Sequence, residues 1–209
     1  MLKDIFPVQI YEVDFPDYDK IKDSLLNDVM SLFNQNLDLY ANHRLFNQSY
    51  SLEGTAEGQY RNLHEVLDYP ELMSWIKEHV QEYWTALKYS KFVKPEIHHM
   101  WANLTPKGGN IIQHNHSPFE IAGSFYVDAS PDRGSLVLVD PNEMIRGRLP
   151  HYDSHESKQG RYYFDHIVEP RPGKLVLFPG WLYHKTQKNP IDTPRVVIGL
   201  NAGLMYKIV

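Results

Sequence analysis

Hydrophobic residues recur along the chain at two different spacings. In residues 17–34 and 62–90 they return every three or four positions, which is the period of an amphipathic helix. A short apolar run at 4–13 contains Pro7, which favours an edge strand or an irregular start. Residues 1–94 are therefore predicted to be mostly helical, with apolar helix faces that pack on the outside of a sheet.

The second spacing begins near residue 95, where short apolar runs alternate with proline and glycine. About eight such runs are typical of a sandwich or barrel rather than an α/β sheet. The fold class expected is mainly β with N-terminal helices (α+β), as one domain over residues 1–209 with its β core at 95–209. The predicted strands are 95–106, 110–116, 120–129, 134–141, 161–170, 173–180, 181–187 and 194–204.

Two polar stretches interrupt these patterns. Residues 36–60 contain glycine and show no period, so we expect a loop with room for one short strand. Residues 141–161 are too long for a hairpin turn and are predicted to leave the sheet near one mouth of the barrel. A substrate would approach the barrel over the rim that these two stretches form.

Composition excludes several classes of protein. The net charge of −5 offers no basic excess for nucleic acid and no polybasic run for a membrane surface. The chain has no cysteine, which rules out disulfides and cysteine-ligated metals and fits a reducing, cytoplasmic location. The N-terminus lacks the apolar segment of a secretory signal, and no apolar run approaches the ~18 residues of a membrane span.

Candidate chemistry centres on His114 and His116. Alternate residues of a strand point to the same face, so both imidazoles would face one way. A third histidine, His184, follows the Pro-Gly turn after an apolar strand, where a neighbouring strand could bring it alongside. Three neutral imidazoles can hold one divalent metal and leave coordination positions free. The alternative is that the pair are ordinary surface histidines.

Arg195 follows eleven residues after His184 and opens an apolar strand. Strand alternation sends Arg195, Val197, Gly199 and Asn201 to one face. A guanidinium facing the interior needs an anionic partner, and no acid has matching parity in this strand. A ligand carboxylate is a suitable partner because guanidinium binds it in bidentate fashion. Otherwise Arg195 starts the strand at the surface, after Pro194.

Together these segments resemble the 2-oxoglutarate/Fe(II) oxygenases of bacteria and marine phages. The resemblance covers roughly residues 95–203, and its pattern of two histidines, an apolar strand and a third histidine is specific. The segments that carry it are Trp101–Asn103, Asn110–His116, Ala122–Tyr126, Gly134–Pro141, Gly173–His184 and Arg195–Asn201.

The resemblance implies a double-stranded β-helix, or jelly roll, with iron inside it. It implies that His114, His116 and His184 are the metal ligands, and that Arg195 binds the C5 carboxylate of 2-oxoglutarate. It further implies that a pocket lined by Asn103, Tyr126 and Asn201 binds this cosubstrate. The activity expected is an Fe(II)- and 2-oxoglutarate-dependent oxygenase of the hydroxylase type, acting on a small-molecule or peptide substrate.

One position departs from the wider superfamily. The usual ligand set is two histidines and one carboxylate, whereas His116 stands at the carboxylate position. An acid from elsewhere, such as Glu120 or Asp140, is an alternative ligand. Three other functions also stay open: a three-histidine dioxygenase that ignores 2-oxoglutarate, a zinc hydrolase or isomerase, and a non-catalytic jelly-roll binding module. Homodimerisation is left open as well.

Overall fold

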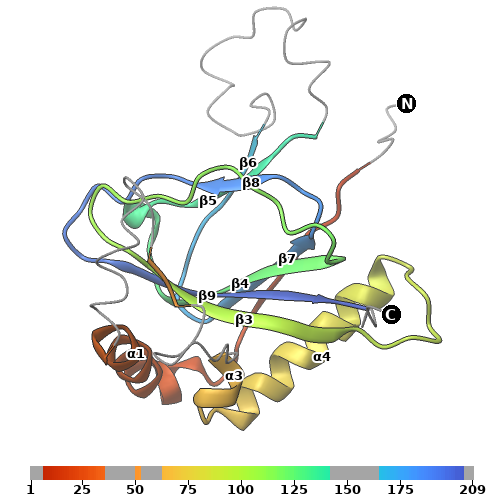
Figure 1. Ribbon diagram of the computed structural model, residues 1–209, viewed down its shortest axis with the longest axis horizontal. Coiled ribbons are helices and arrows are strands. Elements are labelled where there is room, and N and C mark those ends of the chain that lie inside the picture. Colours follow the sequence, from red (N-terminus) through yellow and green to blue (C-terminus); the bar gives the residue numbers. More distant parts are fainter. Residues whose placement is uncertain (1–6, 36–49, 53–62, 142–164, 205–209) are drawn as a thin grey trace, which may run out of the picture.

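The computed structural model describes residues 7–35, 50–52, 63–141 and 165–204. Its strands form two antiparallel sheets, a six-stranded sheet ordered β1-β7-β4-β9-β3-β2 and a three-stranded sheet ordered β6-β5-β8 (Figure 1). The helices are α1 (Tyr18–Gln35), α3 (Leu63–Val66), α4 (Pro70–Ala86) and the 3₁₀ turn η1 (Pro131–Arg133). The strands are β1 (Tyr11–Asp14), β2 (Tyr50–Leu52), β3 (Glu96–Thr105), β4 (Ile121–Asp128), β5 (Leu136–Val139), β6 (Asp165–Val168), β7 (Lys174–Pro179), β8 (His184–Thr186) and β9 (Arg195–Gly203).

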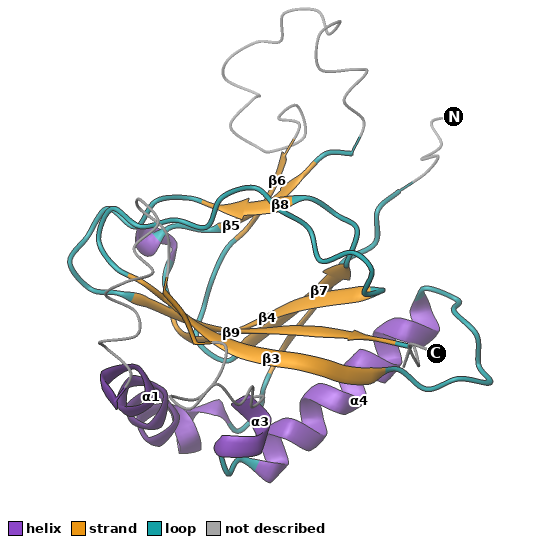
Figure 2. Cartoon of the chain, viewed as in Figure 1, coloured by secondary structure: helices purple, strands orange, loops and turns teal. Residues whose placement is uncertain are grey.

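The six-stranded sheet is covered on both faces (Figure 2). Alternate residues of its strands pack against α1, α3 and α4, among them Phe125, Leu177 and Ile198. The residues between them, such as Tyr126 and Phe178, pack toward the three-stranded sheet. Burial on both faces explains why these strands are nearly continuous hydrophobic runs.

The helices confirm part of the predicted N-terminal half. α1 matches the prediction for 17–34, and the helices pack on the outside of the sheet, as expected. The second helical region predicted at 62–90 is confirmed, and it consists of α3 and α4 with a break before Pro70. Proline disfavours helical backbone in the residue before it, so α4 starts at Pro70 itself.

The N-terminal strand is shorter than predicted. β1 spans Tyr11–Asp14, whereas residues 7–10 are not a strand. As expected, β1 lies at a sheet edge, where it pairs only with β7. The short strand allowed within 36–60 is β2, which pairs with β3 at the other edge. The remainder of that loop and nearly all of 141–161 lie outside the described residues.

The prediction of a regular strand at 110–116 was wrong. The segment makes only isolated bridges, one of which joins His114 to His184. Main-chain bonds to the segment around His184 alternate with side-chain bonds: the Ile111 amide donates to the Thr186 hydroxyl, and the Ile112 carbonyl accepts from the His114 ring. Such local bonds compete with regular sheet pairing.

None of the described helices has the length and hydropathy needed to cross a membrane.

We predict that Phe125→Ala lowers the free energy of unfolding by about 3–5 kcal/mol, the usual cost of truncating a buried phenylalanine. Phe125 is fully buried and its ring contacts Tyr18 and Trp75, so it joins the sheet to two helices. Denaturant titration measures the effect. Phe92→Ala is the matched control, since Phe92 is 88% exposed and should cost less than about 0.5 kcal/mol. A loss below about 1 kcal/mol for Phe125→Ala would contradict this assignment of the core.

Candidate metal centre and adjoining pocket

Backbone hydrogen bonds clamp the two segments that carry the three histidines. The His114 amide donates to the His184 carbonyl at 3.0 Å, and the His184 amide donates to the His114 carbonyl at 2.9 Å. Next to this pair, the His116 amide donates to the Gly180 carbonyl at 2.8 Å. The imidazoles are therefore brought together by main-chain pairing rather than by a regular strand.

Gly180 makes this clamp close. A Cβ at this position would lie 2.0 Å from the Phe119 carbonyl oxygen, a distance that no side chain can occupy. The Gly180 amide also donates to the Glu120 carbonyl at 2.9 Å. The Pro-Gly pair after β7 thus allows the turn before His184 to lie directly on the segment that follows His116.

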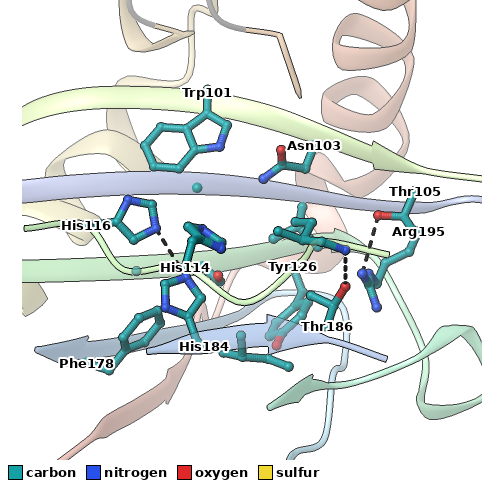
Figure 3. A pocket seen from close by; sticks show the side chains of 16 residues that line it. Trp101, Asn103, Thr105, His114, His116, Tyr126, Phe178, His184, Thr186 and Arg195 are labelled. Atoms are coloured by element: carbon teal, nitrogen blue, oxygen red, sulfur yellow. Dashed lines mark hydrogen bonds between the residues drawn. The ribbon is translucent and has the colours of Figure 1, made fainter. Parts of the chain in front are cut away.

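The three rings face one another with their nitrogens converging (Figure 3). One ring nitrogen from each of His114, His116 and His184 lies within 4.8 Å of the others. The ring centroids of His114 and His184 are 4.3 Å apart, and the rings of His116 and His184 are stacked at 4.9 Å. In the described parts of the chain, no other group of three histidine or acidic side chains converges in this way.

Hydrogen bonds fix the tautomer of two of these rings. His114 Nδ1 lies 2.8 Å from the Ile112 carbonyl, and His184 Nδ1 lies 3.0 Å from the Leu182 carbonyl. Because a carbonyl only accepts, both Nδ1 atoms carry the proton and both Nε2 atoms keep a lone pair. Metal-binding histidines are oriented by this kind of second hydrogen bond.

The spacing of the nitrogens fits a shared ion. His116 Nε2 lies 3.2 Å from His184 Nε2, which is unprotonated. Two nitrogens bound at right angles to one metal with bonds of about 2.1 Å lie about 3 Å apart. The donor set of two neutral imidazoles with fixed tautomers and a third beside them therefore fits a divalent transition metal.

Burial keeps two of the three rings neutral. Together with the smaller effect of the neighbouring His114 ring, burial lowers the pKa of His116 to about 4 and that of His184 to about 3. Neutral imidazole is the form that binds metal, so protons do not compete for these two nitrogens near neutral pH.

The other end of the pocket is formed by Arg195, which is only 2% exposed. Its Nη1 donates to the carbonyls of Gly134 at 2.5 Å and Arg133 at 3.2 Å, and its Nη2 donates to the Thr105 hydroxyl at 3.3 Å. These partners are all uncharged, so no described carboxylate neutralises the guanidinium. Burial lowers its pKa, yet a guanidinium stays charged in proteins.

Pairing between β3 and β9 determines which side chains lie between the two ends. Thr105 pairs with Arg195, Asn103 with Val197 and Trp101 with Gly199. A Cβ on residue 199 would lie 2.5 Å from the Trp101 indole, so glycine is required for this ring to lie over β9. The indole is 5.5 Å from the His116 ring, which places it at the metal end.

Tyr126 contributes a buried donor to the same pocket. Its hydroxyl is buried and has no hydrogen-bond partner among the described residues. Burial raises the pKa of Tyr126 far above its ordinary value, so the hydroxyl stays protonated and available to donate. A buried polar group without a partner is rare in native proteins and indicates a ligand or water at that point.

Most of the predicted site residues line one pocket. It is lined by Trp101, Asn103, Thr105, Ile111, His114, His116, Gly123, Ser124, Tyr126, Leu136, Phe178, His184, Thr186, Arg195, Val197 and Gly199. Asn201 shares the inward face of β9 but is not among them, and its buried Oδ1 has no hydrogen-bond partner. Thr105 and Thr186 were not predicted, although two-residue spacing from Asn103 and His184 could have found them.

Two alternative acidic ligands can be compared with this site. The Glu120 carboxylate accepts from the Leu204 amide at 3.0 Å. Neither Glu120 nor Asp140 is part of the converging group, which contains histidines alone. His98 and His99 also stay outside it: His98 Nε2 faces the Gly203 carbonyl and the His99 ring packs on Phe119.

Residues 99–201 match a family model described as "Putative 2OG-Fe(II) oxygenase". The match contains all three histidines and Arg195. A search of curated proteins finds no match to the chain.

Solved structures share the fold at low sequence identity. AviO1 from Streptomyces viridochromogenes Tue57 has a TM-score of 0.58 at 15% identity, covering 95% of this chain and 91% of that one. HygX from Streptomyces hygroscopicus with nickel and 2-oxoglutarate bound has a TM-score of 0.52 at 11% identity, covering 95% and 84%. The epimerase SnoN in complex with Fe3+, alpha ketoglutarate and nogalamycin RO has a TM-score of 0.57 at 11% identity, covering 94% and 79%. The predicted jelly roll with N-terminal helices is confirmed.

We predict that the metal-free protein loses stability as the pH falls from about 6.5 toward 4. An unfolded histidine has a pKa of about 6.5, so in this window the unfolded chain binds more protons than the native one at His116 and His184. Each group contributes a slope of at most about 1.4 kcal/mol per pH unit. Denaturant titrations at pH 7 and pH 5, with a chelator present, measure the difference. It should shrink in the His116→Gln/His184→Gln variant, and an unchanged difference there would show that other groups cause it.

Proposed function

The chain belongs to the 2OG-Fe(II) oxygenase family through residues 99–201, and from this premise we propose how its own residues serve an Fe(II)- and 2-oxoglutarate-dependent oxygenase. His114, His116 and His184 hold the iron through their converging ring nitrogens. Three imidazoles would hold the ion and leave coordination positions open for cosubstrate and oxygen.

One observation carries the assignment of the cosubstrate. Among the described residues, the buried guanidinium of Arg195 has partners that are all neutral, and it shares a pocket with three convergent imidazoles. A buried charge without a counter-ion is costly, which implies that its partner is a ligand. 2-Oxoglutarate meets both requirements, because its 2-oxo acid end chelates a metal and its far carboxylate suits a guanidinium.

Other side chains complete the cosubstrate site. The Tyr126 hydroxyl donates to the far carboxylate, which would satisfy its buried proton. Asn103 lies between the two ends of the pocket and binds through its amide. Asn201, on the same face of β9, is buried next to this wall, and its amide oxygen has no described hydrogen-bond partner.

Iron and 2-oxoglutarate together supply the activation of O2, coupled to oxidative decarboxylation of the cosubstrate. The contribution of the chain is to position these groups and keep bulk water out. Trp101 over Gly199 and the buried Phe178 beside His184 provide apolar walls next to the imidazoles. His116 donates no negative charge, so the centre carries one more positive charge than a site with two histidines and a carboxylate.

We assign a small molecule as the primary substrate, with a peptide side chain as the alternative. SnoN, which shares the fold, is described in complex with nogalamycin RO, a small molecule. The chain has no basic excess that would suit nucleic acid. Whether the protein forms a homodimer stays a prediction.

We predict that the purified protein binds one Fe(II) per chain under anaerobic conditions and that His184→Ala abolishes tight binding. Removing one of three ligands leaves too few fixed nitrogens to hold the ion. Isothermal titration calorimetry with metal analysis measures this. His98→Ala is the matched control, because its ring lies at the Gly203 carbonyl outside the cluster. Equal binding by both variants would refute the centre, and binding by neither the wild type nor the variants would favour a non-catalytic binding module.

We predict that adding 2-oxoglutarate to the anaerobic Fe(II) protein produces a metal-to-ligand charge-transfer band. Arg195→Met should weaken the affinity measured from this band by about a hundredfold, because the far carboxylate loses its charged partner. Arg171→Met is the control, since this exposed arginine pairs with Asp14 on β1 and does not line the pocket. Iron-dependent O2 consumption without a band would support the three-histidine dioxygenase that does not use 2-oxoglutarate.

A further inference from the structure

A second arginine, Arg133, lies beside the Arg195 end of the pocket without lining it. Its Nη1 donates to the Pro194 carbonyl at 3.0 Å, directly before Arg195 in the chain. In return, Arg195 Nη1 donates to the Arg133 carbonyl at 3.2 Å. The Arg133 guanidinium thus binds the backbone just before Arg195, and the Arg195 guanidinium binds the backbone of Arg133. These two bonds link the start of β9 to η1.

Arg133 also binds the carboxylate of Asp128. Their side chains form an ion pair at 2.8 Å, and both are largely buried, with 17% and 29% of the side chain exposed. Asp128 ends β4 and pairs across the sheet with Val196, the neighbour of Arg195. A carboxylate opposite the neighbour of Arg195 would weaken the binding of an incoming carboxylate if its charge were not compensated.

The backbone after Arg133 is tightly packed at Gly134. Gly134 adopts a φ of +85°, and a Cβ there would lie 2.6 Å from the Gln187 carbonyl and 3.1 Å from Arg195 Nη1. The Gly134 carbonyl is the nearest partner of Arg195, at 2.5 Å. The position of η1 is thus transmitted directly to the guanidinium of Arg195.

We propose that Arg133 is a positioning residue for 2-oxoglutarate: it neutralises Asp128 and holds η1 against β9, so that the charge of Arg195 is directed at the far carboxylate of the cosubstrate. This inference rests on the proposed function, since it concerns the same cosubstrate site. It assigns the two arginines different tasks, because Arg195 touches the ligand whereas Arg133 acts through Asp128 and the backbone.

The test compares two ligands that differ only in the far carboxylate. 2-Oxoglutarate has it, whereas 2-oxopentanoate keeps the metal-chelating end and lacks it. Affinities of both for the anaerobic Fe(II) protein are measured by calorimetry, alongside Fe(II) affinity and thermal unfolding. The variants are Arg133→Gln, Arg133→Lys, Asp128→Asn and the double variant Arg133→Gln/Asp128→Asn, with Arg171→Gln as the control arginine in an exposed ion pair.

Arg133→Gln should bind 2-oxoglutarate roughly tenfold more weakly or worse, because Asp128 is left as an uncompensated charge near the site. Its affinities for 2-oxopentanoate and Fe(II) should stay within about twofold of the wild type, which corresponds to less than about 0.5 kcal/mol. The double variant and Arg133→Lys should recover most of the lost affinity, since neither leaves Asp128 uncompensated. If Arg133→Gln does not fold, the test compares the 2-oxoglutarate affinities of the double variant and of Arg133→Lys with that of Asp128→Asn.

Equal loss of affinity for both ligands would overturn the inference, because a merely structural role for Arg133 predicts it. Wild-type affinity for 2-oxoglutarate in Arg133→Gln would overturn it as well, and would leave the proposed function standing. If the wild-type protein itself binds Fe(II) but no 2-oxoglutarate, the proposed cosubstrate and this inference fail together.

Discussion

The reciprocal backbone hydrogen bonds between His114 and His184 bring together segments that are seventy residues apart in the chain. Main-chain pairing fixes the two segments without using any atom of the imidazoles. The ring nitrogens on the Nδ1 side then bind nearby carbonyls, which leaves the Nε2 side free for a metal. Folding itself therefore brings the three imidazoles together, and the entropic cost of gathering them is met by folding.

Electrostatics divide the pocket into two ends with different requirements. At the histidine end, burial keeps His116 and His184 neutral, which favours binding of a cation. The Arg195 end keeps a buried positive charge, whose acidic neighbour Asp128 is engaged by Arg133 instead. A ligand with a chelating end and an anionic end satisfies both, and the tyrosine hydroxyl at Tyr126 adds a donor with no other partner. The family match gives the chemistry, and these contacts explain how this chain can carry it out.

Sequence patterns predicted the parts of the site that depend on local alternation or on single residue types. Trp101, Asn103 and Arg195 follow the two-residue period of their strands, and all three line the pocket. The histidines were predicted from their spacing, although the regular strand expected for His114 and His116 does not form. There, the Ile111 amide donates to the Thr186 hydroxyl, a contact across seventy-five residues that no local pattern reveals.

The role of Arg133 was likewise beyond sequence reasoning. It depends on the register that brings Asp128 opposite Val196, and this register is shifted by an irregularity after Tyr126. The break before α4 illustrates the opposite case, because Pro70 was visible in the sequence and its effect on the preceding residues is local. The features that the sequence could not predict depend on strand pairing between distant segments, and those that it could predict depend on local conformational preferences.

Anomalous diffraction at the iron edge, from anaerobic crystals grown with Fe(II) and 2-oxoglutarate, tests the central claim most directly. The account predicts one iron peak bonded to the Nε2 atoms of His114, His116 and His184, with the far carboxylate of 2-oxoglutarate on Arg195. A peak elsewhere, or iron at the histidines with the cosubstrate carboxylate turned away from Arg195, would contradict it.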